Sequence, residues 1–494
     1  MNSQNKNLDL IAKYEESHAV ESYLSEGWHV WPLLRNALAW NFFPETDQLI
    51  VLDNVARKFI NVLKRLYSKI IYFSLYRFQY FEHLDSIFIV SSSRRVNIDG
   101  VSHEIYSDPM VELCLKHGIN CRAWEISAGS KNQRNKSFKF GGRMKNETRI
   151  RKSEKLESEV PEWFDDYQIL ASEIIGRKIH WQEVCQLINI TTTRAKIFQD
   201  WFQLSKPKII FSVCWFDAIN MAAIMAAKKL SIVSVEIQHG IQGINHPGYS
   251  LWLKFPAGGY EVYPDIFWEW GVRSVEEIRK YNPILSSKSL AIEGGNLWLN
   301  SWKEKKISSV RNKVDEDCLT ILVVLQLDPP TALIKAINEC EMRWRWIVRF
   351  HPTRSKKLRA LDAKKFIGKN IFFEYPEEVS AYESIINSDC IVTEGSAVAL
   401  EALGVGSNVV ILGDTFLGKL AQQAYEYYIA SGDMIVSSDN NIIKSIIRSV
   451  KSVSSINMSR EFADEASSHI ALNRIFEMAH NLKGKIFDKN SFSL

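Results

Sequence analysis

The chain contains two successive series of short β-branched segments that alternate with helical patterns. The first series begins with SIFIVSS at residues 86–92, and the second begins with LTILVVLQ at residues 319–326. Strands that alternate with helices in this way are typical of parallel sheets with helices on both faces. We therefore predict an α/β fold with two Rossmann-like domains that face each other across a cleft.

The order of these patterns divides the chain of 494 residues into four parts. A chain of this length is expected to hold two or three domains of ordinary size. The predicted parts are an N-terminal helical region at 1–82, a first Rossmann-like domain at 83–300, a second at 301–455 and C-terminal helices at 456–494. Within the first domain, residues 131–155 hold ten basic and two acidic residues, and we interpret them as a solvated insertion or a mobile loop.

Composition and charge narrow the class of protein. Hydrophobic residues make up 46% and charged residues 24% of the chain, as in a soluble globular enzyme. The net charge of +4 is too small to indicate nucleic-acid binding, and none is expected. The seven cysteines form no CxxC pair, which favours free thiols in a reducing compartment. Because MNSQNKNLDLIAKYEES contains no apolar signal segment, we expect a cytoplasmic protein.

Residues 56–81 are the part of the sequence best suited to contact a membrane surface. They hold six basic residues and no acidic residue among apolar and aromatic side chains. At helical spacing Phe59, Leu63 and Leu66 fall on one side, as in a basic helix that lies on an anionic bilayer. The segment thus indicates either peripheral contact with an anionic inner membrane or a surface helix packed on its own domain.

Three motifs follow directly on predicted strands, which is where ligands bind in open parallel sheets. The first is RFHPTR, in which Arg349, His351 and Pro352 lie at the end of the strand WRWIVRF. The proline ends the strand, and the cationic side chains suit a phosphate or a diphosphate. A basic surface turn is the alternative interpretation.

The second motif is TEGSAVALEALGVG, in which the strand CIVT leads into Glu394, Gly395 and Ser396. Ser396 is expected to cap the following helix, which has small residues such as Ala397 near its start. A Gly-Ser entry lets backbone N–H groups approach a phosphate at the positive helix end. Glu401 lies two helical turns after Glu394 and is a candidate ligand of ribose hydroxyls. An ordinary strand, turn and capped helix is the alternative.

The third motif is EIQHGIQGINHPGYS, a glycine-rich loop after the strand SIVSVEI. Histidine titrates near neutrality and can take a proton from an attacking hydroxyl, so His239 is the candidate general base and Glu236 the next candidate. Gly240, His246 and Tyr249 are expected to shape an acceptor pocket. A purely structural loop is the alternative.

At these three motifs the sequence resembles bacterial glycosyltransferases of the GT-B fold that build capsules and lipopolysaccharide O-antigens. QHG with HPGY downstream, RFHP and EGSAVALEALGVG carry this resemblance, which covers roughly residues 86–455. More distantly, the chain is similar to CMP-sialic acid and CMP-Kdo transferases and to CDP-glycerol glycerophosphotransferases. In those relatives an HP pair and a serine-containing turn hold the donor phosphate, which here implies His351, Pro352 and Ser396. The retaining hexose transferases carry two glutamates eight residues apart, whereas Glu394 and Glu401 are seven apart.

The resemblance implies a metal-independent enzyme without a cofactor. It would move a sugar from a nucleotide-sugar donor, held by the second domain, to a lipid-linked or growing cell-surface glycan, presented by the first domain. Arg349, His351 and Ser396 would hold the donor phosphate and Glu401 the ribose. Two alternatives remain, a nucleotide-sugar 2-epimerase of the same bilobed fold and a non-catalytic glycan-binding assembly subunit.

Overall fold

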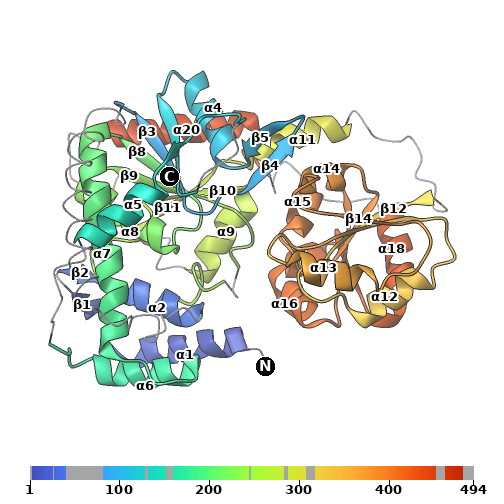
Figure 1. Ribbon diagram of the computed structural model, residues 1–494, viewed down its shortest axis with the longest axis horizontal. Helices are drawn as coiled ribbons and strands as arrows, with labels where there is room; N and C mark the ends of the chain where they lie inside the picture. Colours follow the sequence, from blue (N-terminus) through green and yellow to red (C-terminus); the bar gives the residue numbers. More distant parts are fainter. Residues whose placement is uncertain are drawn as a thin grey trace, which may run out of the picture.

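The computed structural model contains two parallel β-sheets, each packed against helices (Figure 1). It describes residues 3–25, 27–40, 82–127, 132–151, 159–243, 246–282, 287–307, 318–451 and 462–481. We call the seven-stranded sheet with its helices the first lobe, and the six-stranded sheet with its helices the second lobe. The predicted two-lobed α/β fold is confirmed, while the predicted domain boundaries remain predictions.

The first lobe is built on a parallel sheet in the order β11-β10-β9-β8-β3-β6-β7. The strands are β3 (Ser86–Val90), β6 (Cys121–Glu125), β7 (Phe138–Lys139), β8 (Ile209–Ser212), β9 (Val233–Ile237), β10 (Ile266–Glu269) and β11 (Leu290–Glu293). Every residue of β3, β8, β9 and β10 is buried. Such runs form the centre of a parallel sheet because helices cover both of its faces.

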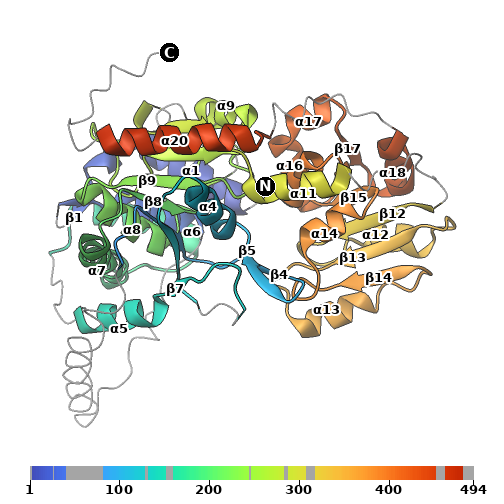
Figure 2. The same ribbon diagram turned by 90° about the horizontal axis from the view of Figure 1, so that it is seen from above.

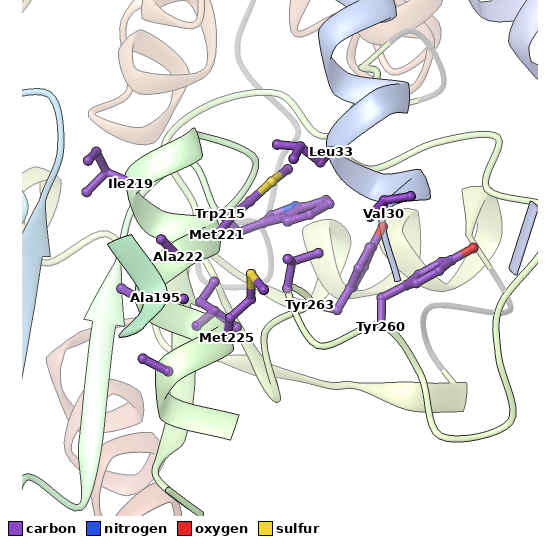
Figure 3. Packing of buried hydrophobic residues seen from close by; sticks show 14 of the residues in the cluster. Val30, Leu33, Ala195, Trp215, Ile219, Met221, Ala222, Met225, Tyr260 and Tyr263 are labelled. Atoms are coloured by element: carbon purple, nitrogen blue, oxygen red, sulfur yellow. The ribbon is translucent and has the colours of Figure 1, made fainter. Parts of the chain in front are cut away.

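The helices of the first lobe pack around this sheet, and α11 (Leu297–Ile307) also packs into the core of the second lobe. Besides α11, they are α4 (Ser107–Lys116), α5 (Gly141–Arg151), α6 (Phe164–Ile175), α7 (Trp181–Ser205), α8 (Ala218–Lys229) and α9 (Val272–Tyr281). Asp217 precedes α8, and its side chain caps the helix by accepting a hydrogen bond from the Ile219 N–H over 2.8 Å. Figure 3 shows Ala222 and Met225 of α8 near Ala195 of α7 in this core.

The N-terminal region joins the core of the first lobe. It contains α1 (Ser3–Ser17), a short 3-10 turn η1 (Val20–Ser22), the hairpin β1 (Leu24–Ser25) and β2 (Trp28–His29), and α2 (Trp31–Ala39). Val30 and Leu33 pack in the same cluster as Tyr260 and Tyr263 (Figure 3). The predicted helical character is therefore confirmed for these residues. The predicted basic helix at 56–81 lies outside the described residues.

The described part of residues 131–155 contains regular structure that the sequence analysis did not predict. Residues 138–139 form β7, and residues 141–151 form α5. The rings of Phe140 and Trp201 of α7 lie 6.1 Å apart, and Phe140 is fully buried. Apolar side chains between the basic residues thus anchor the segment to α7, which a count of charges does not reveal.

An antiparallel hairpin that the sequence analysis did not predict reaches from the first lobe to the second (Figure 2). Its strands are β4 (Arg95–Ile98) and β5 (Val101–Glu104). Asp99 and Gly100 at its tip have φ angles of 51° and 78°. An Asp-Gly pair with two positive φ angles is the preferred two-residue hairpin turn. Val96 and Ile98 of this hairpin pack against the core of the second lobe.

The second lobe is built on a parallel sheet in the order β14-β13-β12-β15-β16-β17. The strands are β12 (Thr320–Val324), β13 (Arg345–Arg349), β14 (Ile371–Glu374), β15 (Cys390–Thr393), β16 (Asn408–Leu412) and β17 (Met434–Ser437). Its helices are α12 (Thr331–Asn338), α13 (Lys356–Ala363), α14 (Ala381–Ile386), α15 (Val398–Gly404), α16 (Phe416–Ala424), α17 (Glu426–Ala430) and α18 (Ile442–Lys451), with a 3-10 turn η5 (Asp439–Asn441). The edge strand β17 was not predicted.

The last described helix, α20 (Glu465–Asn481), returns from the second lobe to the first (Figure 2). Its Leu472 and Ile475 are fully buried in the cluster that includes Phe211 of β8 and Trp268 of β10. The predicted C-terminal helix is confirmed over this range. Within the ranges given above, none of the helices combines the length and the apolar character needed to cross a bilayer.

Candidate functional site

The two lobes touch at the turns that follow β9 and β15. A Cβ atom added to Gly240 would lie 3.5 Å from the Cβ of Ala397, which is an ordinary van der Waals distance. On the first-lobe side, the Tyr106 hydroxyl donates a hydrogen bond to the His239 carbonyl over 3.2 Å. Two of the three sequence motifs therefore meet at the carboxyl ends of their strands, as expected for ligand sites in parallel sheets.

His239 is held at this contact in a neutral state. Its Nε2 atom lies 3.3 Å from the Cys214 sulfur. Its Nδ1 atom is buried and has no hydrogen-bond partner among the described residues. Burial, together with the nearby Arg94 and His246, lowers the pKa of His239 well below its usual 6.5. The imidazole is therefore unprotonated at neutral pH.

Cys214 and Arg94 complete the surroundings of His239, and the sequence analysis selected neither of them for the site. Cys214 follows β8 with a φ of 62°, a left-handed conformation that is rare outside glycine. Arg94 donates from Nη2 to the Cys214 sulfur over 3.4 Å. Burial raises the pKa of the Cys214 thiol to about 11, so the sulfur is a neutral thiol. The sequence did contain a signal that could have identified Arg94, because two arginines closely follow the strand SIFIV, at the same edge of the sheet.

His246 lies beside His239 in a setting of aromatic rings. The two imidazole centres are 6.4 Å apart, and Phe216 contacts both rings, with centroids 6.1 Å from His239 and 5.1 Å from His246. The Gly248 N–H donates to His246 Nδ1 over 3.1 Å. Burial lowers the pKa of His246 to about 4. The loop thus supplies a second neutral imidazole next to the candidate base.

Glu236 and Tyr249 lie beneath this loop rather than at the contact between the lobes. Both side chains are fully buried, and the Tyr249 hydroxyl donates to the Glu236 carboxyl group. The Trp215 N–H donates to the same oxygen over 3.1 Å. Burial raises the pKa of Glu236 to about 8, so it is mostly protonated at neutral pH. This geometry gives both residues a structural part in holding the loop.

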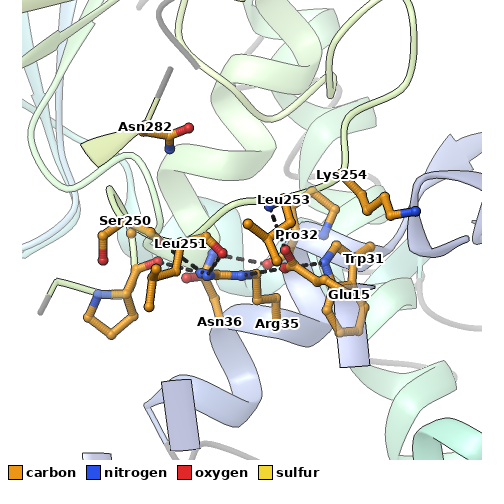
Figure 4. A network of polar contacts seen from close by, with 12 residues as sticks. Glu15, Trp31, Pro32, Arg35, Asn36, Ser250, Leu251, Leu253, Lys254 and Asn282 are labelled. Atoms are coloured by element: carbon orange, nitrogen blue, oxygen red, sulfur yellow. Dashed lines mark hydrogen bonds and ion pairs between the residues drawn. The ribbon is translucent and has the colours of Figure 1, made fainter. Parts of the chain in front are cut away.

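A buried ion pair in the N-terminal region braces the other end of the loop (Figure 4). Arg35 donates from Nε to Glu15 Oε1 over 2.8 Å, and both side chains are fully buried. The same guanidinium donates to the carbonyls of Pro247, Ser250 and Leu251. It satisfies three carbonyls of one chain segment, which fixes the backbone that carries His246.

In the second lobe, the turn after β15 differs by one residue from the prediction. α15 begins at Val398 with Ala397 in the cap position, while Ser396 Oγ accepts a hydrogen bond from the Val398 N–H over 3.3 Å. Ser396 therefore precedes the predicted cap position but still bonds a free N–H of the first helical turn. At Gly395, an added Cβ would lie 2.8 Å from the Cβ of Ala421, so the close packing of α16 requires glycine there.

The two glutamates of the second motif are buried. Glu401 is 8% exposed and accepts a hydrogen bond from the Tyr382 hydroxyl over 2.7 Å. Glu394 is 5% exposed, and its Oε2 atom has no hydrogen-bond partner within the described parts of the chain. Burial raises the pKa of both carboxyl groups. For Glu401, the Tyr382 bond and the charge of Arg94 from the first lobe oppose that rise in pKa.

The basic turn after β13 is largely neutralised by its own lobe. Arg349 is 7% exposed and donates to the Val379 carbonyl over 2.7 Å, and it lies 3.5 Å from a Glu374 oxygen. His351 is half-buried, with Nδ1 2.8 Å from the Thr353 hydroxyl, and Pro352 beside it is exposed. Arg349 is therefore engaged within its own lobe, and His351 is the predicted phosphate ligand of this turn that remains available at the strand end.

The similarity of this chain to solved structures is distant. No protein-family model matches the sequence, and no curated protein matches it either. Among solved structures, the chain is similar to the S. aureus MnaA–UDP co-structure, at 13% identity and a TM-score of 0.47, covering 82% of this chain and 100% of that one. It is similar to Neisseria meningitidis UDP-GlcNAc 2-epimerase bound to UDP-GlcNAc, at 13% identity and a TM-score of 0.46, covering 79% and 99%.

The chain is also similar to MurG of Acinetobacter baumannii, at 10% identity and a TM-score of 0.41, covering 80% of this chain and 100% of that one. These low identities and TM-scores carry no argument about what this chain binds. The chemistry of the site therefore rests on its own residues. They are a neutral imidazole with an unpartnered nitrogen, a guanidinium beside it, and a serine-containing turn in contact across the lobes.

Proposed function

We propose that the protein is a glycosyltransferase that moves a sugar from a nucleotide-sugar donor to a lipid-linked or growing cell-surface glycan, such as a capsule or an O-antigen. The observation that carries the proposal is the contact between the His239–Gly240 turn and Ala397. It brings a candidate base of the first lobe next to the serine-containing turn of the second. The sequence resemblance to surface-polysaccharide transferases supports the same assignment.

In this proposal His239 is the general base. An acceptor hydroxyl loses its proton to the imidazole while its oxygen bonds to the anomeric carbon of the donor sugar. The bond between that carbon and the nucleotide phosphate breaks, and the phosphate leaves with the electron pair. A positioned base of this kind contributes about 10²–10⁴-fold to a rate. The base must be unprotonated, which agrees with the lowered pKa of His239.

Cationic and N–H groups would stabilise the phosphate that leaves. We assign this part to His351, to Ser396 with the N–H groups of its turn, and to the guanidinium of Arg94 from the first lobe. Donors fixed before the reaction stabilise developing negative charge without reorganisation. The proposal therefore places a metal-independent donor site between the lobes, with the acceptor approaching from the side of His246.

A thermal-shift panel of UDP, GDP, CMP, CDP and dTDP tests the donor site. A ligand that binds only the folded state raises the melting temperature by mass action. We expect one nucleotide to raise it selectively, and His351→Ala and Ser396→Ala each to reduce that rise. Arg345→Ala, at the opposite end of β13, is the matched control. If no nucleotide stabilises the protein, the donor site is wrong and a non-catalytic glycan-binding subunit is favoured.

A nucleotide-sugar 2-epimerase is the second candidate, and the carboxyl groups of Glu394 and Glu401 favour it. Both are buried with raised pKa values, Glu394 in the turn after β15 and Glu401 in α15. Protonatable carboxyl groups are suited to move protons on and off a sugar carbon without a second substrate. Conversion of the donor in the absence of any acceptor, followed by NMR, distinguishes this reaction from transfer.

We further propose that the protein works in the cytoplasm and contacts the inner membrane through residues 56–81. Basic residues near an anionic surface contribute about 1 kcal/mol each. Cosedimentation with anionic vesicles is expected for the wild type and is expected to be lost on replacement of Lys64, Arg65 and Lys69 by glutamate. Sedimentation of the triple variant with the vesicles, or failure of the wild type to sediment, contradicts this assignment.

A further inference from the structure

Two cavities border the hairpin β4–β5, and none of their lining residues belongs to the predicted site. One, of about 530 Å³, lies between this hairpin, α4 and α11. The other, of about 500 Å³, lies between the hairpin tip and residues around α14 of the second lobe. Ile98 and Trp302 line both cavities, so the two are neighbours along the hairpin, and we call them together the hairpin groove. Each volume falls in the range of ~300–1,000 Å³ typical of ligand sites.

The charges of this hairpin groove disfavour an anionic ligand. The part near the hairpin tip is lined by the carboxylates of Asp99, Glu378 and Glu383, and its described lining holds no lysine or arginine. The larger cavity has carboxylates and cations in similar number. Two of those cations are engaged in ion pairs, Arg134 with Glu112 and Lys116 with Glu465. These pairs also neutralise the two carboxylates, so the larger cavity is close to neutral, and a nucleotide or a phosphate would meet uncompensated negative charge near the hairpin tip.

The polar groups of the groove suit hydroxyls instead. Asp108 and Trp298 line the larger cavity, and each has a buried polar atom without a partner among the described residues, Oδ1 of Asp108 and Nε1 of Trp298. One atom accepts hydrogen bonds and the other donates them, and a hydroxyl group serves both. Carboxylates are likewise strong acceptors for hydroxyl donors. Trp298 and Trp302 contribute only the edges of largely buried rings to the wall beside them, since the two side chains are 7% and 4% exposed.

Trp298 also connects the groove with the candidate catalytic site. It lines a gap of about 10 Å³ whose other walls include Tyr106 and Gln238. The Tyr106 hydroxyl in turn donates to the His239 carbonyl over 3.2 Å. Trp298 and Tyr106 thus lie between the groove and the candidate base.

We propose that the hairpin groove binds a neutral oligosaccharide, namely the stretch of acceptor glycan that lies beyond the sugar that reacts. The assignment of this oligosaccharide as the acceptor rests on the proposed transferase function. The binding of a neutral oligosaccharide is argued from the residues of the groove alone. An uncharged chain of hydroxyl groups suits the two neighbouring cavities, the carboxylates near the hairpin tip and the two unpartnered polar atoms.

Saturation-transfer NMR with maltotetraose, cellotetraose, mannotetraose and tetra-N-acetylchitotetraose tests this proposal, with a sulfated tetrasaccharide as the anionic control. We expect at least one neutral probe to bind and the sulfated probe not to bind. Asp99→Asn combined with Glu383→Gln should weaken binding about tenfold, because charged acceptors are replaced by neutral ones. Asn tolerates the positive φ at position 99, so the turn is kept.

Trp298→Phe tests the indole N–H separately, since it keeps an aromatic ring and removes the donor. Glu339→Gln is the matched control, because Glu339 is an exposed carboxylate at the end of α12 that does not line the groove. Absence of binding by all four neutral probes, equal binding of the sulfated probe, or unchanged affinity in both variants overturns the proposal. The nucleotide thermal shift is measured on the same variants. Absence of a nucleotide thermal shift in the wild type would contradict the transferase function. Binding of a neutral probe in the same experiment would still show that the groove is an oligosaccharide site.

Discussion

Gly240 of the first lobe and Ala397 of the second are in contact distance, because a Cβ on Gly240 would lie 3.5 Å from the Cβ of Ala397. The turn after β9 thus approaches the turn after β15 so closely that an added methyl group at position 240 would be in ordinary contact. A longer side chain at position 240 is expected to press against the second lobe.

We predict that Gly240→Ala leaves the separation of the lobes unchanged and that Gly240→Leu increases it. Overpacking of a close contact costs about 1–3 kcal/mol, which the molecule can relieve by moving the lobes apart. Small-angle X-ray scattering should show a larger radius of gyration for the leucine variant only. Identical scattering of both variants would mean that the lobes touch in another way in solution.

The second prediction concerns the proton acceptor. His239→Ala and His239→Gln should each lower kcat by roughly 10²–10⁴-fold, because neither side chain can take the proton. Nucleotide affinity should stay nearly unchanged, since the donor turn belongs to the other lobe. His246→Ala is the comparison, with its main effect expected on the acceptor KM. Steady-state kinetics with both substrates varied separate these effects, and near-normal kcat for both His239 variants would exclude this residue as the base.

The pH dependence of the wild type gives an independent check on His239. Its pKa lies well below 6.5, so the working, unprotonated form persists as the pH falls through 6.5. The acidic limb of kcat/KM is therefore expected below pH 6.5. A limb at or above that value would show that another group controls the rate.

The third prediction concerns the ion pair of Glu15 and Arg35, both fully buried. Arg35→Met leaves an unpaired buried carboxylate and should lower the free energy of unfolding by about 3–5 kcal/mol. The double variant Glu15→Gln with Arg35→Met should be less destabilised than the sum of the single variants, because it leaves no lone charge. Guanidinium denaturation measures both. Lys116→Met, which removes an exposed pair with Glu465, is the control and should cost at most about 1 kcal/mol.

The fourth prediction uses Glu236, whose pKa is raised from 4.5 to about 8 by burial. Because the folded state holds this proton more tightly than the unfolded state, the stability it contributes is complete below pH 4.5. It is lost as the pH rises toward 8. Between pH 6.5 and 8 the wild type should therefore lose stability at up to about 1.4 kcal/mol per pH unit from this group.

Glu236→Gln keeps an acceptor for the Trp215 N–H and cannot ionise, so its free energy of unfolding should fall less over the same pH window. Glu293→Gln, which changes an exposed carboxylate on β11, is the matched control and should follow the wild type. Parallel pH curves for the wild type and Glu236→Gln would mean that Glu236 is already ionised in the folded protein.

The candidate site was only partly predictable from the sequence. His239 and Ser396 were found because each closely follows an apolar strand, and strand ends are recognisable locally. Glu236 lies three residues before His239, yet it is fully buried and bonded to Tyr249. In a strand covered on both faces, the sequence pattern does not show that a carboxyl group is enclosed. Arg94 also follows a strand, but the sequence does not show that it bonds Cys214, which is 120 residues away along the chain.

The sequence by itself determined the two series of strands and helices, because β-branched runs, caps and glycines act on neighbours within a few residues. Tertiary structure alone decided which turns meet. Arg35 holds carbonyls more than 200 residues away, Phe140 anchors a basic segment to α7, and the hairpin at Asp99 reaches the second lobe. Such contacts depend on the packing of distant segments into one close-packed interior, which no local pattern in a single chain encodes.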